Sequence, residues 1–151
     1  MVEYETKRVA TRAHVNVRRR LDASGDAVWT LISNGGEVER WFSWVAQTVL
    51  VDAGEGGLRV IRMRDGTSFD EYITVNDEGT RTYQYYAPDP PLLAKHVIGT
   101  QRVETSSSGG TFLVWSVTFD LTFGAPNDFT QTMRALYEGA SSQIDALARA
   151  L

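Results

Sequence analysis

Apolar and polar residues alternate along much of the chain between residues 13 and 121, which is the period of a strand with one buried face. The first run starts at Ala13 and places Val15, Val17 and Leu21 on one side. Further runs, separated mostly by turn-forming residues, predict strands at 45–52, 58–64, 68–76, 80–86, 95–105 and 111–121. Strands joined by short turns favour an antiparallel meander.

Two parts of the chain have a helical period instead. Ser24 is a typical N-cap for a short helix that ends at Asn34-Gly35-Gly36, and residues 37–42 (EVERWF) indicate a second, shorter helical turn. After Pro126, apolar residues recur at spacings of three and four and predict one long amphipathic helix. This stripe consists of Phe129, Met133, Leu136, Ala140, Ile144, Leu147 and Leu151.

The order of elements predicts an α+β fold in which the long C-terminal helix covers a curved antiparallel sheet of about seven strands. A curved sheet against a straight helix leaves an interior volume, and such volumes are common ligand sites. Gly139 and Ala140 interrupt the helical stripe, either for close packing on the sheet or to leave space for a ligand. We expect one domain over 13–151, with 1–12 as a tail or an extra edge strand.

Composition and charge narrow the function. The net charge of −4 argues against a general nucleic-acid binder, and the absence of cysteine excludes disulfides and thiolate chemistry. No segment approaches the roughly 18 apolar residues of a membrane span, so we expect no stable membrane insertion. The first twelve residues lack the apolar core of a secretion signal, and the expected location is the cytoplasm.

Two charged residues lie on apolar strand faces. Arg59 shares its face with Ile61 and Met63, and Glu71 shares its face with Phe69. A three-residue turn at 65–67 would place Ile61 opposite Glu71 and make Arg59 a diagonal neighbour of Glu71. Because a buried charge is costly unless it is paired, we expect the two to form an ion pair on the cavity side.

Three interpretations of this pair stay open. Arg59 and Glu71 satisfy each other and fix the strand register, or they line the cavity and act on a ligand as oxygen-binding or acid–base groups. In the third, both lie in solvent.

Aromatic residues form a second group of candidates. Tyr83 and Tyr85 share one strand face, and Trp115 lies on the apolar face of its own strand. A buried hydroxyl or indole N–H needs a partner, which a cavity with polar groups would provide. The alternative is ordinary core packing.

Metal, cofactor and covalent chemistry lack a sequence signature. The two histidines, His14 and His96, have no further ligands at metal spacing, and the chain has no phosphate-binding glycine loop or nucleophile motif. Any chemistry would therefore be acid–base work on a bound organic molecule. His96, beside the proline-rich loop at 88–91, is either a proton shuttle near the cavity mouth or a surface residue.

An ordered set of motifs supports a more specific interpretation. It comprises DAVWTLIS (26–33), Trp41, GLRVIRMRDG (57–66) with Glu71 following, TYQYY (82–86), IGT (98–100) and LVWSVTF (113–119). Together they resemble the START-like (SRPBCC) superfamily with its helix-grip fold, and most of all its bacterial polyketide cyclase/dehydrase-like branch. The resemblance implies a sheet wrapped around the long C-terminal helix, with two short helices after the first strand. It also places the aromatic cluster of Trp41, Phe42 and Trp44 near one end of the cavity, as a mouth or lid or as packing between helix and sheet.

The first functional hypothesis is the binding of a small hydrophobic, lipid-like or polyketide-like molecule between sheet and helix, without cofactor, metal or nucleic acid. A homodimer is left open. The expected lining residues are Trp41, Phe42, Ile61, Met63, Phe69, Tyr83, Tyr85, Trp115, Met133, Leu136 and Ala140. One alternative is a non-covalent, metal-independent cyclase or dehydratase with Glu71, Arg59 and His96 as catalytic residues. The other is an interaction module with a filled core.

Overall fold

The computed structural model describes residues 11–151, which form one antiparallel sheet and its covering helices. Seven strands lie in the order β1-β7-β6-β5-β4-β3-β2. Their bounds are β1 (Thr11–Leu21), β2 (Val45–Asp52), β3 (Leu58–Met63), β4 (Ser68–Asp77), β5 (Thr82–Ala87), β6 (Ala94–Thr105) and β7 (Thr111–Leu121). The predicted α+β helix-grip fold is confirmed. β1 begins two residues before the expected position, and the expected tail at 1–10 lies outside the described residues.

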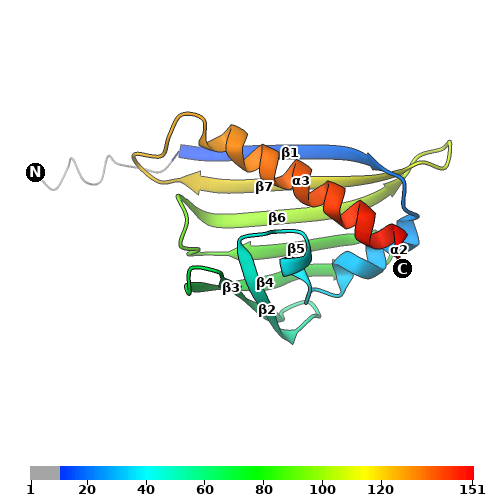
Figure 1. Cartoon of the computed structure of the whole chain (residues 1–151), viewed down its shortest axis with the longest axis horizontal. Coiled ribbons are helices and arrows are strands. Elements are labelled where there is room, and N and C mark those ends of the chain that lie inside the picture. The colour runs from blue at the N-terminus through cyan, green and yellow to red at the C-terminus, as the bar shows by residue number, and fades with distance from the viewer. Residues whose placement is uncertain (1–10) are drawn as a thin grey trace, which may run out of the picture.

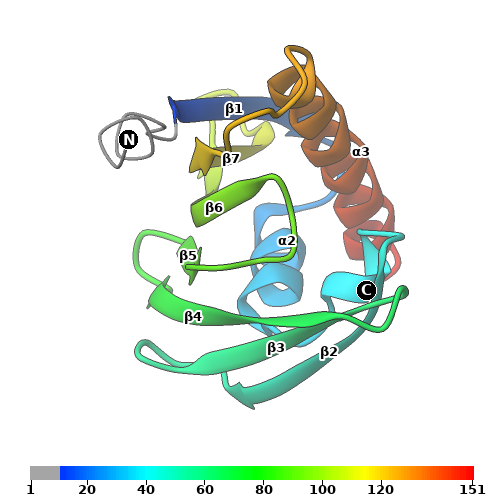
Figure 2. The same cartoon turned by 90° about the vertical axis from the view of Figure 1, so that its left-hand side faces the viewer.

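The helices lie on the concave side of the sheet. α2 (Gly25–Ser33) and the 3-10 turn η1 (Val38–Arg40) follow β1, and α3 (Phe129–Arg149) ends the chain. Figure 1 shows α3 running across the sheet, and Figure 2 shows the sheet curving from β1 round to β2 with α2 and α3 inside the curve. The Ser24 hydroxyl accepts a hydrogen bond from the Ala27 N–H at 3.2 Å, as expected of an N-cap.

The buried face of α3 is turned slightly from the predicted one. Leu136 is 40% exposed, while its neighbour Tyr137 is only 7% exposed. Both positions are three or four residues from Met133 and Ala140, so the spacing alone fits either stripe. The aromatic side chain is the buried one. The buried residues of α3 are Met133, Tyr137, Ala140, Ser141, Ile144 and Ala148.

The β3–β4 hairpin has a different register from the expected one. Arg59 lies directly opposite Glu71, and Ile61 lies opposite Phe69. The N–H of Met63 donates to the carbonyl of Thr67 at 2.8 Å, so the loop consists of residues 64–66. Gly66 occupies the left-handed region at φ +93° and allows this three-residue loop. A shift of two residues keeps every side chain on its predicted face.

Gly99 on β6 permits a close approach between the sheet backbone and an aromatic ring. Gly99 pairs with Tyr85, and a Cβ atom at Gly99 would overlap the end of the Tyr85 ring. The ring has little freedom to move away, since the Trp115 indole N–H donates to its hydroxyl oxygen.

We predict that Gly99→Ala lowers the free energy of unfolding by about 1–3 kcal/mol, as overpacking of a core does. Gly139→Ala is the matched control, since a Cβ at Gly139 meets no atom within 4 Å and the residue lies inside α3. It should instead stabilise by about 0.5–1 kcal/mol through helix propensity. Urea unfolding followed by circular dichroism measures both, and equal effects of the two substitutions would contradict the prediction.

Candidate functional site

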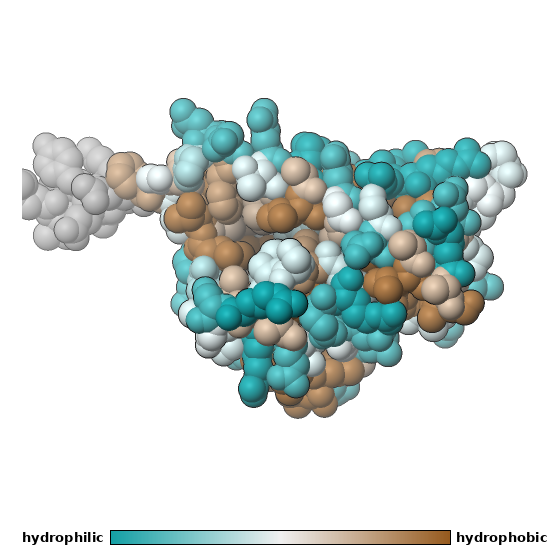
Figure 3. All heavy atoms as spheres, in the orientation of Figure 1, coloured by the Kyte–Doolittle hydropathy of each residue, from teal (hydrophilic) through white to brown (hydrophobic). Residues whose placement is uncertain are grey.

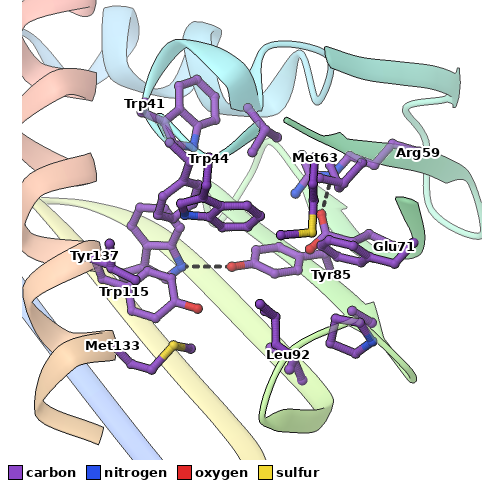
Figure 4. Close-up of a pocket in the computed structure, with 18 of the residues that line it drawn as sticks. Trp41, Trp44, Arg59, Met63, Glu71, Tyr85, Leu92, Trp115, Met133 and Tyr137 are labelled. Atoms are coloured by element: carbon purple, nitrogen blue, oxygen red, sulfur yellow. Dashed lines mark hydrogen bonds and ion pairs between the residues drawn. The ribbon is translucent and has the colours of Figure 1, made fainter. Parts of the chain in front are cut away.

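A cavity of about 240 Å³ lies between the concave face of the sheet and the first half of α3. Figure 3 shows the surface hollowed on this side, with hydrophobic residues at the rim of the hollow. Figure 4 shows the side chains that line it, from the sheet, from α3, from the segment after η1 and from the loop before β6. The walls are mostly apolar and aromatic. A charged or strongly hydrated molecule would lose its hydration there, and only a polar side chain that pairs with it would compensate.

Most of the predicted site residues meet at this cavity. Arg59 and Glu71 line it together with most of the predicted ligand-binding residues. These are Trp41, Phe42, Ile61, Met63, Phe69, Tyr85, Trp115, Met133 and Leu136.

Two predicted lining residues do not face this space. Tyr83 is fully buried, but its hydroxyl lies against Gly35 rather than at the cavity wall. Ala140 lines a second, more open depression of about 470 Å³ between α3 and the segment after η1. The space beside Gly139 and Ala140 is thus this second depression, and the first cavity lies nearer the start of α3.

His96 lies away from the cavity. Its side chain is 57% exposed and its Nδ1 atom is 2.8 Å from Oδ2 of Asp120. A bulge at the start of β6 gives His96 a φ of +51° and turns the neighbouring Val97, not His96, toward the cavity. The expected proton shuttle at the cavity mouth is thus not formed in this arrangement. The hydrogen bonds from His96 and Arg12 instead lower the pKa of Asp120.

Several lining residues were missed. Gln101 is 2% exposed on β6, where it shares the inner face with Val97 and Val103. A polar residue within an apolar alternation is the same signal that identified Arg59 and Glu71. Tyr137 and the loop residues Pro90 and Leu92 also line the cavity, and a loop has no period from which its facing could be predicted. Trp44, which the sequence places near the cavity end with Trp41 and Phe42, lines it as well.

The Arg59–Glu71 pair closes one end of the cavity. Arg59 Nε donates to Glu71 Oε1 at 2.8 Å, and the two residues are 3% and 7% exposed. Arg59 Nη1 also donates to the carbonyl of Gly35, just beyond α2, at 3.1 Å. The guanidinium lies 5.1 Å from the ring centre of Tyr85. Burial lowers the pKa of Arg59, but attraction to Glu71 and to Tyr83 and Tyr85 outweighs it and raises the pKa overall.

A hydrogen-bonded aromatic group forms the floor. The indole N–H of Trp115 donates to the Tyr85 oxygen at 3.2 Å. The rings of Trp115 and Tyr137 are 4.9 Å apart, and Phe42 packs 5.6 Å from Trp115. Burial is the main reason why the pKa values of Tyr85 and Tyr137 lie well above the usual value of a phenol.

Within residues 11–151 no group of three or more His, Asp or Glu side chains is placed to hold a metal ion. None of the helices in that range is long and apolar enough to span a membrane.

The curved sheet, the long helix and the apolar space between them define a helix-grip protein with an internal cavity. A family described as polyketide cyclase/dehydrase and lipid transport matches residues 12–151. The chain belongs to this family, which suggests binding of a hydrophobic ligand. A comparison with curated protein sequences finds no match.

Solved structures share the fold at low sequence identity. XoxI of Bacillus cereus is 20% identical with a TM-score of 0.76, over 89% of this chain and 94% of that one. The major latex-like protein 151 of Panax ginseng is 14% identical with a TM-score of 0.72, over 89% and 96%. Ara h 8.0201 is 18% identical with a TM-score of 0.74, over 93% and 100%. At these identities the likeness shows the fold alone.

The buried pair predicts a strongly non-additive effect on stability. Glu71→Ala leaves a buried guanidinium without its carboxylate and should cost about 3–5 kcal/mol. The double variant Arg59→Met/Glu71→Leu removes both charges and should cost less than Glu71→Ala alone. A double-mutant cycle by urea unfolding measures the coupling, and small additive effects would contradict a buried pair.

The buried phenols predict a loss of stability in alkali. The pKa values of Tyr83, Tyr85 and Tyr137 are raised by burial, so the folded state holds protons that the unfolded chain releases near pH 10. The stability that they contribute is complete below about pH 10 and is lost as the pH rises toward the folded pKa values. Urea unfolding above pH 9 should show a falling free energy, and phenolate absorbance from these residues should appear only on unfolding. A free energy that stays level above pH 10 would contradict this.

Proposed function

We propose that the protein binds a small, largely apolar molecule in the cavity between the sheet and α3. The observation that carries this proposal is the cavity of about 240 Å³ with mostly apolar and aromatic walls. The description of the family, which includes lipid transport, supports it.

The volume limits the size of the ligand. Binding pockets for drug-sized molecules are about 300–1,000 Å³, and an apolar cavity of about 150 Å³ holds benzene. A space of about 240 Å³ therefore suits one aromatic ring with a short substituent, or an aliphatic molecule of similar size.

The lining residues favour binding over proton transfer. A general acid or base works best with a pKa near the working pH, whereas burial raises the pKa values of Tyr85 and Tyr137 far from neutrality. Glu71 is held by Arg59 at 2.8 Å, and His96 does not line the cavity. The cyclase or dehydratase hypothesis thus finds less support than a carrier or sensor of a hydrophobic molecule. The interaction-module hypothesis required a filled core, which the cavity argues against.

Ethylbenzene is a suitable first probe, and we expect it to raise the melting temperature. At ten times its Kd, mass action contributes roughly 1.4 kcal/mol to the stability of the folded state. Ala87→Leu should weaken the effect, because Ala87 lines the cavity and the larger side chain would occupy part of it. Calorimetric titration measures the binding directly.

The matched control is Ala148→Leu, since Ala148 is also buried, at 2% exposure, but does not line the cavity. It should destabilise by about 1–3 kcal/mol through overpacking and still bind ethylbenzene. No binding by the parent protein, or equal binding by Ala87→Leu, would overturn the proposed function.

A further inference from the structure

The cavity contains buried hydrogen-bond donors that have no partner in the protein. Among residues 11–151, three buried side-chain polar atoms lack a hydrogen bond: Trp44 Nε1, Tyr83 Oη and Gln101 Nε2. Trp44 and Gln101 line the cavity. Buried polar groups are nearly always paired, so two unpaired donors on residues that line one cavity require a specific explanation.

Gln101 is the more deeply buried of the two. It lies on β6 directly opposite Trp115 of β7 and Tyr83 of β5, and it is 2% exposed. Tyr85 pairs with Gly99, so Gln101 and Tyr85 are diagonal neighbours on the same face, within reach of long side chains. The Gln101 amide and the Tyr85 hydroxyl therefore belong to one region of the cavity floor.

Tyr85 contributes a third donor to this region. Its oxygen accepts from the Trp115 indole N–H at 3.2 Å. A phenol oxygen offers one proton and two acceptor sites, so this bond leaves the Tyr85 O–H to donate. Figure 4 shows the Tyr85 oxygen turned toward the Trp115 nitrogen, with Trp44 above the Tyr85 ring in that view.

The nearby charges do not favour an anion here. The positive charge of Arg59 is already used by Glu71 and the Gly35 carbonyl. An ionised carboxylate would lose its hydration in an apolar space without gaining a free cation. An alcohol or amine would bring donors of its own, while an aliphatic or aromatic hydrocarbon would leave the protein donors unpaired.

We propose that Gln101, Tyr85 and Trp44 form a donor subsite that selects a neutral carbonyl oxygen on a small aromatic ligand, such as an aryl ketone or aldehyde. The proposal rests on the proposed function, since it names the class of ligand that the cavity takes. The aromatic rings hold the ring of the ligand, and the three donors determine which substituent it carries.

The test compares acetophenone with ethylbenzene, which has nearly the same shape but no oxygen. Calorimetric titration gives the ratio of the two affinities. Gln101→Met removes the amide without removing a protein hydrogen bond, and it should reduce the ratio in favour of acetophenone about three- to tenfold. Gln143→Met is the matched control on the exposed surface of α3 and should leave the ratio unchanged. Benzoate should bind at least tenfold more weakly than acetophenone.

A spectroscopic signal reports on Trp44 independently of the Gln101 variant. Trp44→Phe identifies one of the four indole N–H resonances in a proton–nitrogen correlation spectrum. Acetophenone should move this resonance downfield, as hydrogen bonding to a carbonyl does, and ethylbenzene should not.

The outcomes separate the two proposals. If ethylbenzene binds but Gln101→Met leaves the affinity ratio unchanged and the Trp44 resonance does not move downfield, the donor subsite is wrong and the apolar cavity stands. Benzoate binding as tightly as acetophenone would also overturn the subsite, because it would indicate an anion site. If neither neutral probe binds, both proposals fail.

Discussion

The ion pair between Arg59 and Glu71 connects more of this structure than any other polar contact at the cavity. It joins β3 to β4 across the sheet and, through the Gly35 carbonyl, ties the sheet to the end of α2. A cation near the end of a helix is also favoured by the helix dipole. Because both charges are desolvated, neither residue can be replaced singly without leaving an unpaired charge, and the geometry of this end of the cavity is correspondingly fixed.

The aromatic floor extends this constraint across the sheet. The guanidinium lies over the Tyr85 ring, the Tyr85 oxygen accepts a hydrogen bond from Trp115 of β7, and the Trp115 ring packs against Tyr137 of α3. Gly99 allows the ring to lie flat against β6. The sheet and the helix are therefore held apart at a set distance by packed rings, of which Trp115 and Tyr85 are hydrogen-bonded to each other. The cavity follows from this spacing, since these side chains support the helix without filling the space beside them.

The fold and most of the cavity lining could be predicted from the sequence, because the spacing of apolar residues determines which side chains of a strand or helix face inward. Alternation placed Arg59, Glu71, Tyr85 and Trp115 on the inner face, and a register shift of two residues left that assignment unchanged. Period alone did not resolve Leu136 from Tyr137, since both positions fit the helical spacing. The helical period correctly predicted that Ala140 faces inward, but it does not distinguish the two spaces that α3 borders, and Ala140 lines the second one.

Local irregularities account for the remaining differences. The bulge at the start of β6 decided the orientation of His96, and a bulge has no reliable sequence signal. The proline-rich loop carries Pro90 and Leu92 to the cavity by a path that no alternation describes. These features depend on contacts between segments that are distant in the sequence, and the pattern of apolar residues does not reveal such contacts.

The two halves of α3 differ in how they are anchored. The second half buries Ile144 and Ala148, and Asp145 accepts a hydrogen bond from the Ala23 N–H at 2.8 Å. The first half borders the cavity and leaves Leu136 40% exposed, so it has fewer atoms to pack against. Local unfolding starts where buried contacts are fewest, which makes the first turns of α3 the part of the helix that opens at the lowest free energy. We therefore expect the end of the helix that forms the cavity wall to open before the rest, which would let a molecule enter while the packed remainder of the core stays in place.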